Sequence, residues 1–403
     1  MAPEAVIVSA ARSPIGRATK GSLRELRPDD LAVLMVQAAL AKVPEVSDID
    51  DLVLGTAQPA AEGGKNLGRA VAVLAGHDKV PGVTVNRFCA SSLQTTRMAL
   101  HAIKAGEGDV FVSVGVESSS HGFPADPPGV RNPILDEASA RTTAWVDDGG
   151  RDPWADPRTR GELPDLFMPM GVTAEVVSRR IGMSRAEQDE FALRSHALAV
   201  QRADEGFWAR EITPVSLPDG AVIASDDGPR RGTSLEALAE LKPAFVPDGT
   251  VTAGNSCPLN DGAAALVIMS DQKAKDLGLV PLARIVSTAV SALSPEIMGL
   301  GPVEAIPAAL RRAGLTIGDI DLFEINEAFA VQCLGSARAL GIPIDKLNVN
   351  GGAIALGHPF GMTGARIAAT ILNSLQWHDK QFAVESMCVG GGQGVAMVLE
   401  RLS

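Results

Sequence analysis

The last third of the chain repeats the order of patterns found in the first third, and this internal repeat constrains the fold more than any other feature. AVIVSA at 5–10 corresponds to ARIVST at 283–288, and DIDDLV at 48–53 corresponds to DIDLF at 319–323. TVNRFC at 84–89 corresponds in outline to NVNGGA at 348–353. Each match is weak by itself, but their shared order predicts a duplicated unit. Two copies packed side by side would bring equivalent turns together.

Strands and helices alternate over the first 120 residues. We expect strands at 5–9, 51–54 and 110–116, and helices at 31–41 and, after turn residues, within 63–75. This alternation predicts a layered α/β fold with helices packed on a sheet. With 403 residues, 46% of them hydrophobic, the chain can bury a large core, and its length suggests two or three domains.

The character of the sequence changes after Glu117. Six prolines lie between residues 121 and 160 among many charges, which predicts an irregular excursion from the sheet. Helices follow, and Ser184 and Glu187 form a capping box for a helix that should run to about Gly206. We interpret 121–252 as an inserted domain that covers the core. The remaining boundaries are an N-terminal half at 1–120, a return to it at 253–274, and a C-terminal half at 275–403.

Composition excludes several classes of protein. The net charge of −12 argues against non-specific nucleic-acid binding, so an anionic ligand needs a local basic patch. The four cysteines lie far apart without a CxxC pair, which predicts free thiols in a reducing, cytoplasmic compartment. The N-terminus enters a strand at once rather than a signal peptide, and no apolar run is long enough to span a membrane.

Cys89 stands at a predicted strand-to-helix junction. After it, Leu93, Leu100 and Ile103 recur at helical spacing. A thiol at a helix N-terminus lies beside free N–H groups and the positive end of the helix dipole, which favour a thiolate. The alternative is a buried structural cysteine.

Three polar stretches in the last third lie in apolar surroundings. Asn326 and Glu327 follow a predicted strand, where capping of the next helix is the alternative to a functional role. His358 lies between glycine-rich backbone and a proline, where a structural histidine is the alternative. Cys388 follows a predicted strand at 382–387 and begins CVGGGQG, whose glycines should expose N–H groups able to form an oxyanion hole. Two cysteines, a histidine and an asparagine predict thiolate attack on a carbonyl carbon, with the second thiol as general acid and base.

These motifs, in this order, resemble those of the thiolase family over essentially the whole chain. They are NRFCASS around Cys89, NEAFA at 326–330, GGAIALGHPFGMTGAR at 351–366, and CVGGGQG at 388–394. The resemblance implies two similar five-stranded α/β halves in a layered α-β-α-β-α arrangement, with a loop domain inserted into the first. It also implies reversible cleavage of a 3-ketoacyl-CoA by CoA, as in β-oxidation of fatty acids. CoA is then a co-substrate, and neither a permanently bound cofactor nor a metal is expected.

The resemblance also implies roles for individual residues. Cys89 resembles the nucleophile that becomes acylated, and His358 resembles the histidine that activates it and contributes to a first oxyanion hole. Asn326 resembles the residue that holds a water completing that hole. Cys388 resembles the cysteine that protonates the leaving acetyl-CoA enolate and then deprotonates CoA. The N–H groups of Cys89 and Gly390 resemble a second oxyanion hole for the thioester oxygen.

The CoA-binding residues follow from the same resemblance. Arg230 takes the place of a family arginine near the CoA nucleotide, with a solvated loop charge as the alternative. The positions that match the lining of the pantetheine tunnel are Met170, Ala253, Cys257, Ala328 and Phe329. Cys257 stands where the family commonly has a serine.

Other positions depart from the family pattern and leave the acyl specificity open. Pro169 replaces the histidine of the His-Met-Gly sequence of acetoacetyl-CoA thiolases, and degradative thiolases resemble Pro-Met-Gly instead. Ser92 replaces a usual glycine and is expected to crowd the helix start. Ala237 replaces a frequent serine.

We therefore predict a cytoplasmic degradative 3-ketoacyl-CoA thiolase that forms a homodimer or homotetramer. Its expected partners are acyl-CoA, CoA and other β-oxidation enzymes, not nucleic acid. The first alternative is a biosynthetic acetoacetyl-CoA thiolase. The second is a decarboxylating, ketosynthase-like condensing enzyme, a class that usually lacks a second active-site cysteine such as Cys388. The third is a catalytically silent acyl-CoA-binding member.

Overall fold

The computed structural model describes residues 3–121 and 131–403. Its main feature is a ten-stranded sheet in the order β10-β11-β12-β9-β1-β8-β5-β3-β4, with the short β2 (Gly16–Arg17) paired to β8. The N-terminal half-sheet comprises β1 (Ala5–Arg12), β3 (Asp51–Gly55), β4 (Gly82–Val85), β5 (Val110–Ser118) and β8 (Asn260–Ser270). The C-terminal half-sheet comprises β9 (Ala283–Ala292), β10 (Leu322–Ile325), β11 (Phe382–Val389) and β12 (Gln393–Arg401). The two halves join through antiparallel pairing of β1 with β9 at Val6 and Ile7.

The two half-sheets have the same strand order. From edge to junction, the first half reads β4-β3-β5-β8-β1, and the second reads β10-β11-β12-β9 beyond an isolated parallel bridge between Phe323 and Leu347. This bridge occupies the place of β4, so the fifth strand of the second half is reduced to one residue pair. The predicted fold class, a duplicated α/β unit, is confirmed.

The repeat extends to hydrogen bonds at one end of each half-sheet. Asp50 accepts hydrogen bonds from the backbone N–H groups at the start of β5, at 2.7 and 2.8 Å. Asp321 accepts from the two N–H groups at the start of β11, at 3.0 and 2.9 Å. Each carboxylate precedes a parallel strand and ties it to the next one.

The junction strands β1 and β9 also match in detail. The register of β1 shifts between Ile7 and Ser9, and β9 shows the same shift against β12 on either side of Val286. Ser9 donates a 2.7 Å hydrogen bond to Ala39, and Ser287 donates one of the same length to Ala309. Shared irregularities of this kind indicate a common backbone plan that survives the change of sequence.

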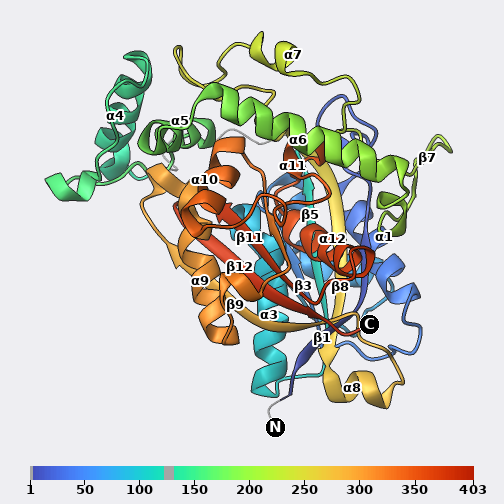
Figure 1. Cartoon of the computed structure of the whole chain (residues 1–403). Helices are drawn as coiled ribbons and strands as arrows, with labels where there is room; N and C mark the ends of the chain where they lie inside the picture. The colour runs from blue at the N-terminus through green and yellow to red at the C-terminus, as the bar shows by residue number, and fades with distance from the viewer. Residues whose placement is uncertain (1–2, 122–130) are drawn as a thin grey trace.

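Helices divide the molecule into layers (Figure 1). The outer face of the first half-sheet packs on α1 (Pro28–Ala41) and α2 (Leu67–Leu74). Between the half-sheets lie α3 (Ser91–Ala105) and α12 (Thr363–Trp377), and the outer face of the second packs on α9 (Gly301–Ala313) and α10 (Ala330–Leu340). Alternation along the strands explains the layers, because Phe111 faces α3 and α12 whereas Val110 and Val112 face α1 and α2.

The chain leaves the sheet between β5 and β8, two strands that pair antiparallel. This stretch contains α4 (Asp136–Asp147), α5 (Met170–Ile181), α6 (Arg185–Asp204), β6 (Val215–Ser216), β7 (Val222–Ile223) and α7 (Leu235–Ala239). These helices gather along one side of the molecule, where α6 crosses above α11 (Ala353–Leu356) and α12 (Figure 1). The insertion boundaries at 121 and 252 remain predictions.

Most predicted elements are confirmed, including the capping box of α6, in which Ser184 and Glu187 exchange hydrogen bonds. The irregular stretch predicted at 121–160 is wrong in part. Pro133 and Pro157 each begin a 3₁₀ helix, at Pro133–Leu135 and Pro157–Arg160, because a proline is tolerated in a first helical turn. Helix α4 lies between these two 3₁₀ helices. Pro124, Pro127 and Pro128 lie outside the described residues.

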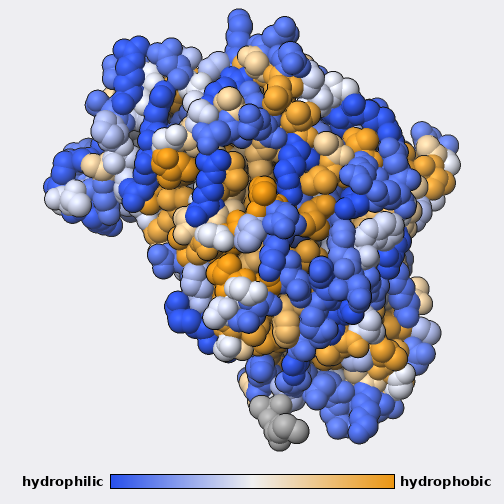
Figure 2. All heavy atoms as spheres, viewed as in Figure 1, coloured by the Kyte–Doolittle hydropathy of each residue, from blue (hydrophilic) through white to orange (hydrophobic). Residues whose placement is uncertain are grey.

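The remaining short helices connect these elements. They are α8 (Asp271–Asp276) and 3₁₀ helices at Ala61–Gly63, Phe88–Ala90, Trp208–Arg210, Pro295–Leu300 and Ile317–Asp319. On the face drawn in Figure 2, hydrophilic side chains cover the α4 side and apolar ones gather nearer the middle. No helix in the described part of the chain combines the length and apolarity needed to cross a membrane.

Candidate active site

The Cys89 turn follows the predicted strand–turn–helix plan. After β4, the Asn86 side-chain oxygen accepts a 2.7 Å hydrogen bond from the Phe88 N–H. Phe88 has φ of 43°, a left-handed conformation that is costly for a bulky residue. The 3₁₀ helix Phe88–Ala90 then leads directly into α3. The strained turn places Cys89 at the start of a helix, partly accessible to solvent.

The protonation state of Cys89 differs from the sequence-based expectation. Burial raises the pKa of Cys89 to about 12, although the N–H groups of Gly390 and of Cys89 itself face the sulfur and oppose this effect. The charge of Glu117 raises the pKa further. The prediction of a stabilised thiolate is therefore wrong for the substrate-free protein, because loss of hydration outweighs the local N–H groups. A base must remove the proton as the sulfur attacks.

His358 is built as a proton acceptor. Its Nδ1 lies 2.7 Å from the Thr363 hydroxyl oxygen, and that hydroxyl donates a 2.7 Å hydrogen bond to the Pro359 carbonyl. Since a hydroxyl has one hydrogen, we assign the ring proton to Nδ1, which leaves a lone pair on Nε2. Burial, with a smaller contribution from Arg366, lowers the pKa of His358 to about 3. The resting imidazole is therefore neutral, with Nε2 free to accept a proton.

Among the predicted catalytic residues, two buried side chains hold polar atoms that have no partner among the described residues. They are Nε2 of His358 and both amide atoms of Asn326. The capping alternative for Asn326 is therefore wrong, and α10 has no side-chain cap. Buried polar groups are nearly always hydrogen-bonded, and each unpaired one costs about 1–3 kcal/mol. These atoms are available to a substrate or to a bound water.

Cys388 lies within β11, one residue before its end, rather than after the strand as predicted. Gly391 and Gly392 have φ of 75° and 76°, which favours glycine at the turn into β12. This turn aims the N–H of Gly390 at the Cys89 sulfur. Burial, followed by the charges of Cys89 and Cys257, raises the pKa of Cys388. Three thiols therefore share one desolvated region.

The two halves meet at this region, as the repeat predicted. The 3₁₀ helix that carries Cys89 contacts β11 and α12 of the second half. The Ser92 hydroxyl accepts a 2.9 Å hydrogen bond from the Ala365 N–H. The expected crowding by Ser92 is not observed, because its side chain occupies space that Gly115 leaves open. A Cβ added to Gly115 would lie 2.5 Å from the Cβ of Ser92.

Four of the predicted CoA-binding residues lie beside the thiols. A Cβ added to Gly390 would lie 3.8 Å from the Met170 sulfur. The Cys257 N–H donates a 3.0 Å hydrogen bond to the Ala328 carbonyl. Phe329 pairs with Ser256 in a β-bridge and packs edge-on against Phe245, with ring centroids 6.1 Å apart. Their apolar cluster includes Cys388.

The other two predicted CoA-binding residues, Ala253 and Arg230, lie at the exposed periphery. The Arg230 N–H donates a 3.3 Å hydrogen bond to Nδ1 of His196. Burial and the nearby Arg17 lower the pKa of Arg230, and no ion pair neutralises its guanidinium within the described residues. Arg230 therefore offers positive charge at a distance from the thiols, which suits one end of an elongated ligand.

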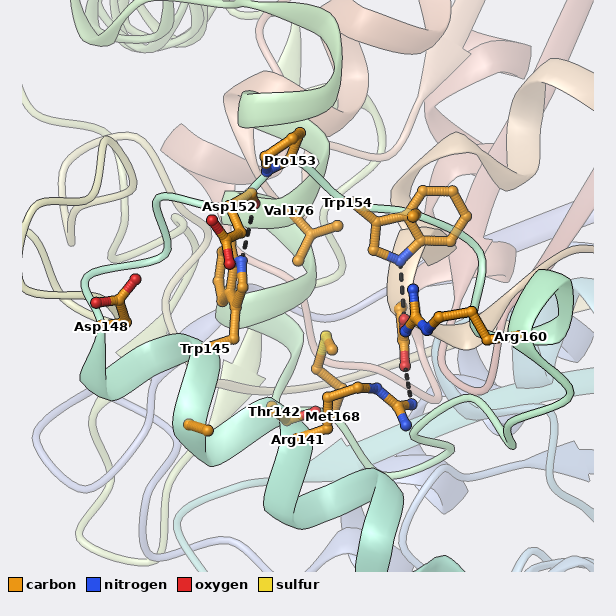
Figure 3. A pocket seen from close by; sticks show the side chains of 13 residues that line it. Arg141, Thr142, Trp145, Asp148, Asp152, Pro153, Trp154, Arg160, Met168 and Val176 are labelled. Atoms are coloured by element: carbon orange, nitrogen blue, oxygen red, sulfur yellow. Dashed lines mark hydrogen bonds and ion pairs between the residues drawn. The ribbon is translucent and has the colours of Figure 1, made fainter.

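A cavity of about 430 Å³ lies behind Met168, on the side of α4 and α5 (Figure 3). Trp145 and Trp154 form two of its walls, with Val176 and Met168 between them. Met168 also belongs to the apolar cluster of Cys388, so this cavity and the thiols share one wall. The cavity is lined by Arg141, Thr142, Ala144, Trp145, Asp148, Asp152, Pro153, Trp154, Ala155, Arg160, Met168, Val176 and Glu296.

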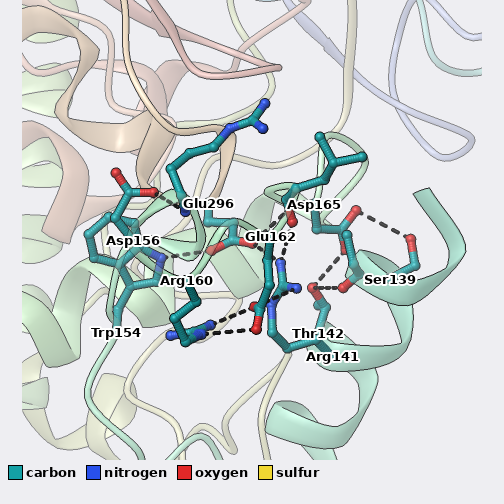
Figure 4. A network of polar contacts seen from close by, with 12 residues as sticks. Ser139, Arg141, Thr142, Trp154, Asp156, Arg160, Glu162, Asp165 and Glu296 are labelled. Atoms are coloured by element: carbon teal, nitrogen blue, oxygen red, sulfur yellow. Dashed lines mark hydrogen bonds and ion pairs between the residues drawn. The ribbon is translucent and has the colours of Figure 1, made fainter. Parts of the chain in front are cut away.

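Buried Glu296 anchors this wall (Figure 4). Its carboxylate accepts hydrogen bonds from Arg141 at 3.0 Å, from the Trp154 indole at 2.8 Å and from the Asp165 N–H at 2.9 Å. Asp165 in turn accepts from the Thr142 hydroxyl at 2.7 Å. The network ties the segment before Met170 to the C-terminal half and satisfies the polar groups of the wall.

Sequence reasoning missed three residues that support the site, namely Glu117, Asn260 and Thr363. Asn260 accepts a 2.9 Å hydrogen bond from the His358 N–H. A polar residue that ends an apolar strand, as Glu117 does, was an available signal. Within the described residues, no group of three or more His, Cys, Asp or Glu side chains is placed to hold a metal ion.

Comparison with known proteins agrees with this geometry. The thiolase N-terminal domain family matches residues 5–272, and the thiolase C-terminal domain family matches 279–401. The chain is 43% identical to a 3-ketoacyl-CoA thiolase of Bacillus subtilis, over 98% of this chain and 99% of that protein. It superposes on the dimeric peroxisomal thiolase of Saccharomyces cerevisiae with TM-score 0.88 and 35% identity, covering 99% of this chain and 97% of that one. Human mitochondrial 3-ketoacyl-CoA thiolase in complex with CoA gives TM-score 0.85 and 34% identity, covering 100% and 98%. The protein is an acyltransferase, and the chain belongs to the thiolase family.

Proposed function

We propose that this enzyme cleaves 3-ketoacyl-CoA with CoA through an acyl-Cys89 intermediate, in the degradative direction. One observation carries the proposal. The Cys89 sulfur faces the Gly390 N–H beside Cys388, while Nε2 of His358 and the amide of Asn326 are buried without partners in the described structure. A nucleophile, a base and unused hydrogen-bonding groups are what acyl transfer requires.

In the first half-reaction, Cys89 gives its proton to Nε2 of His358 and attacks the 3-keto carbon. The resulting imidazolium donates to the new oxyanion, and a water held by Asn326 supports it. Collapse breaks the C2–C3 bond and returns an acyl-Cys89 and the acetyl-CoA enolate. Cys388 protonates that enolate and becomes a thiolate.

In the second half-reaction, the Cys388 thiolate takes the proton of CoA, and the CoA sulfur attacks acyl-Cys89. Cys89 leaves and recovers its proton from His358. The N–H groups of Cys89 and Gly390, which face the Cys89 sulfur, support the thioester oxygen of acyl-Cys89 while CoA attacks it. Because burial raises the pKa of Cys388, its thiol holds the proton until a strong base such as an enolate forms.

Pro169 supports the degradative direction over the biosynthetic alternative. It caps the start of α5, one residue before Met170, and makes no side-chain hydrogen bond there. A proline has no imidazole with which to bind a short acetoacetyl group. The Bacillus subtilis relative named as a 3-ketoacyl-CoA thiolase supports the same direction.

The CoA site is proposed to run from the thiols past Met170, Cys257, Ala328 and Phe329 toward Arg230, with Ala253 on its outer side. The human relative bound to CoA supports CoA as co-substrate, and the dimeric yeast relative supports a homodimer. Free cysteines throughout the chain support a reducing, cytoplasmic setting.

A panel of 3-ketoacyl-CoA substrates, from acetoacetyl through medium linear to polycyclic chains, tests the direction and the chain length. We expect kcat/KM for medium or bulky chains to equal or exceed that for acetoacetyl-CoA. A preference for acetoacetyl-CoA of about tenfold, or 1.4 kcal/mol in transition-state binding, would support the biosynthetic alternative. Decarboxylation without thiolysis would support the ketosynthase-like alternative.

A further inference from the structure

Glu117 is a buried carboxylate at the end of β5 that has no role in the mechanism above. Its side chain is 3% exposed. One oxygen accepts a 3.1 Å hydrogen bond from the Thr56 hydroxyl. The other accepts from the N–H of Ala57 at 2.8 Å and from the N–H of Gly361 at 2.9 Å. The carboxylate therefore joins the end of β3, the end of β5 and the loop that carries His358.

The last of these bonds crosses between the two halves of the molecule. Gly361 lies three residues after His358 and packs so closely on the first half that an added Cβ would lie 2.2 Å from the Val116 carbonyl oxygen. On the neighbouring strand β8, Asn260 accepts from the His358 N–H at 2.9 Å. The first half thus grips the His358 loop at two points, one at each end of the segment 358–361.

The chemistry of a carboxylate explains why glutamate stands here. The three donors named above converge on it, together with the backbone N–H of Gln58, and a carboxylate accepts all of them with charge-assisted bonds. A glutamine could keep its oxygen on the N–H groups of Ala57 and Gly361, but its NH2 group would then face Thr56, whose hydroxyl would have to accept instead of donate, and the bonds would lose the charge that strengthens them. The charge has a cost, because it also acts on Cys89 and disfavours a thiolate before the substrate arrives.

We propose that Glu117 is a positioning residue that sets the place of His358 relative to Cys89 through the Gly361 N–H. The inference rests on the proposed roles of Cys89 and His358. It adds that proton transfer between them depends on a group supplied by β5, which touches no substrate. Misplacement of a catalytic group by about 1 Å lowers the rate by roughly 10²-fold.

The test uses Glu117→Gln, Glu117→Asp and, as matched control, Asp50→Asn. Asp50 also accepts two backbone N–H groups next to β5, but at the opposite end of the sheet. We expect Glu117→Gln and Glu117→Asp to lower kcat roughly 10- to 100-fold with KM changed less than about threefold, and Asp50→Asn to leave kcat unchanged. Equal losses of kcat in Asp50→Asn would overturn the proposal, since they would indicate a general effect on the sheet.

A second readout needs no substrate and so separates this proposal from the proposed function. The rate of Cys89 alkylation by iodoacetamide is followed against pH, with labelling at Cys89 confirmed by mass spectrometry. The titratable groups that act on Cys89 are Glu117 and the thiols Cys257 and Cys388, and of these only Glu117 is altered. Glu117→Gln removes a negative charge, so its alkylation midpoint should move to lower pH even as kcat falls. Glu117→Asp keeps the charge and should move it less.

Folded Glu117 variants with kcat within twofold of the parent would refute the positioning role. If neither variant folds while Asp50→Asn does, Glu117 is a structural residue and the proposal is equally refuted. If the parent enzyme cleaves none of the 3-ketoacyl-CoA panel but the alkylation profile shifts as expected, the proposed function fails and the link between Glu117 and Cys89 stands.

Discussion

The two half-sheets share one plan but differ at the turn that follows the edge strand. In the first half, β4 passes through Phe88–Ala90 into an unbroken α3, and Cys89 stands at the start of that helix. In the second half, α11 is only one turn long and stops at Gly357, whose φ is 114°. The long helix α12 resumes at Thr363, and the loop between them carries His358.

This difference shows how a duplicated scaffold acquires two distinct catalytic parts. The first turn is stiff and local, because Asn86 and Phe88 shape it within a few residues of Cys89. The second is anchored from a distance, by Glu117 and Asn260 of the other half. A nucleophile needs a fixed orientation of its side chain, which a single turn supplies. A base must be aimed at a partner on another element, which requires contacts from that element.

Loss of the nucleophile should have the largest effect. We expect Cys89→Ser to abolish the covalent acyl adduct and to lower thiolysis by about 10⁴- to 10⁶-fold, as in other enzymes that lose their nucleophile. Iodoacetamide should label Cys89 first in the parent enzyme, and acyl-CoA should protect it. Cys257→Ser is the matched control, because it changes a thiol of the same region to the serine that the family commonly has at this position. This variant should retain most activity. If Cys257 or Cys333 were labelled faster than Cys89, the assignment of Cys89 as the nucleophile would be wrong.

Loss of the second-half thiol should have the next largest effect and should spare one step. Cys388→Ser raises the pKa of the proton donor, so thiolysis should fall about 10²- to 10⁴-fold. Exchange of the acetyl-CoA α-protons with deuterated solvent should slow in parallel. Acylation of Cys89 from a simple acyl-CoA, where no carbanion forms, should persist. Near-normal α-proton exchange in this variant would contradict the division of labour between the two halves.

The pH dependence of stability should reveal the buried base. Burial lowers the pKa of His358 to about 3, below its value in the unfolded chain. Between these two pKa values the unfolded chain binds a proton at His358 and the folded enzyme does not. The contribution of neutral His358 to the free energy of unfolding is complete above about pH 6.5 and is lost as the pH falls toward 3. The parent should therefore lose more free energy of unfolding than His358→Asn between pH 6.5 and 4, measured by urea titration. Parallel curves would argue for a solvated His358.

The smallest effect should be the most symmetric. Asp50→Asn and Asp321→Asn each weaken two hydrogen bonds to backbone N–H groups at the same place in the repeat. We expect each to lower the free energy of unfolding by about 1 kcal/mol and to leave kcat within twofold. The two values should agree within about 0.5 kcal/mol. A much larger loss for one of them would show that the halves differ in their scaffold as well as in their turns.

Much of the fold was predictable because its signals are local. The strand at 5–9, the helix at 31–41 and the capping box of Ser184 and Glu187 depend on periodicity and on residues within one turn of each other. Helix α4 was missed because nearby prolines suggested irregular structure, whereas Pro133 stands just before its first turn. Cys388 was placed after its strand because the glycines that follow obscure where β11 ends.

The sequence alone determined the duplicated α/β plan and the four motifs that bring Cys89, Asn326, His358 and Cys388 into consideration. Only the tertiary structure decided the protonation of Cys89, the ring tautomer of His358 and the role of Glu117. The physical reason is that these three features depend on contacts between residues that lie far apart in the sequence. Hydration is lost when distant elements pack over a thiol, and Glu117 meets Gly361 across 244 residues of sequence. Local patterns encode where a helix begins, but they do not encode which distant elements pack around the thiol beside its start.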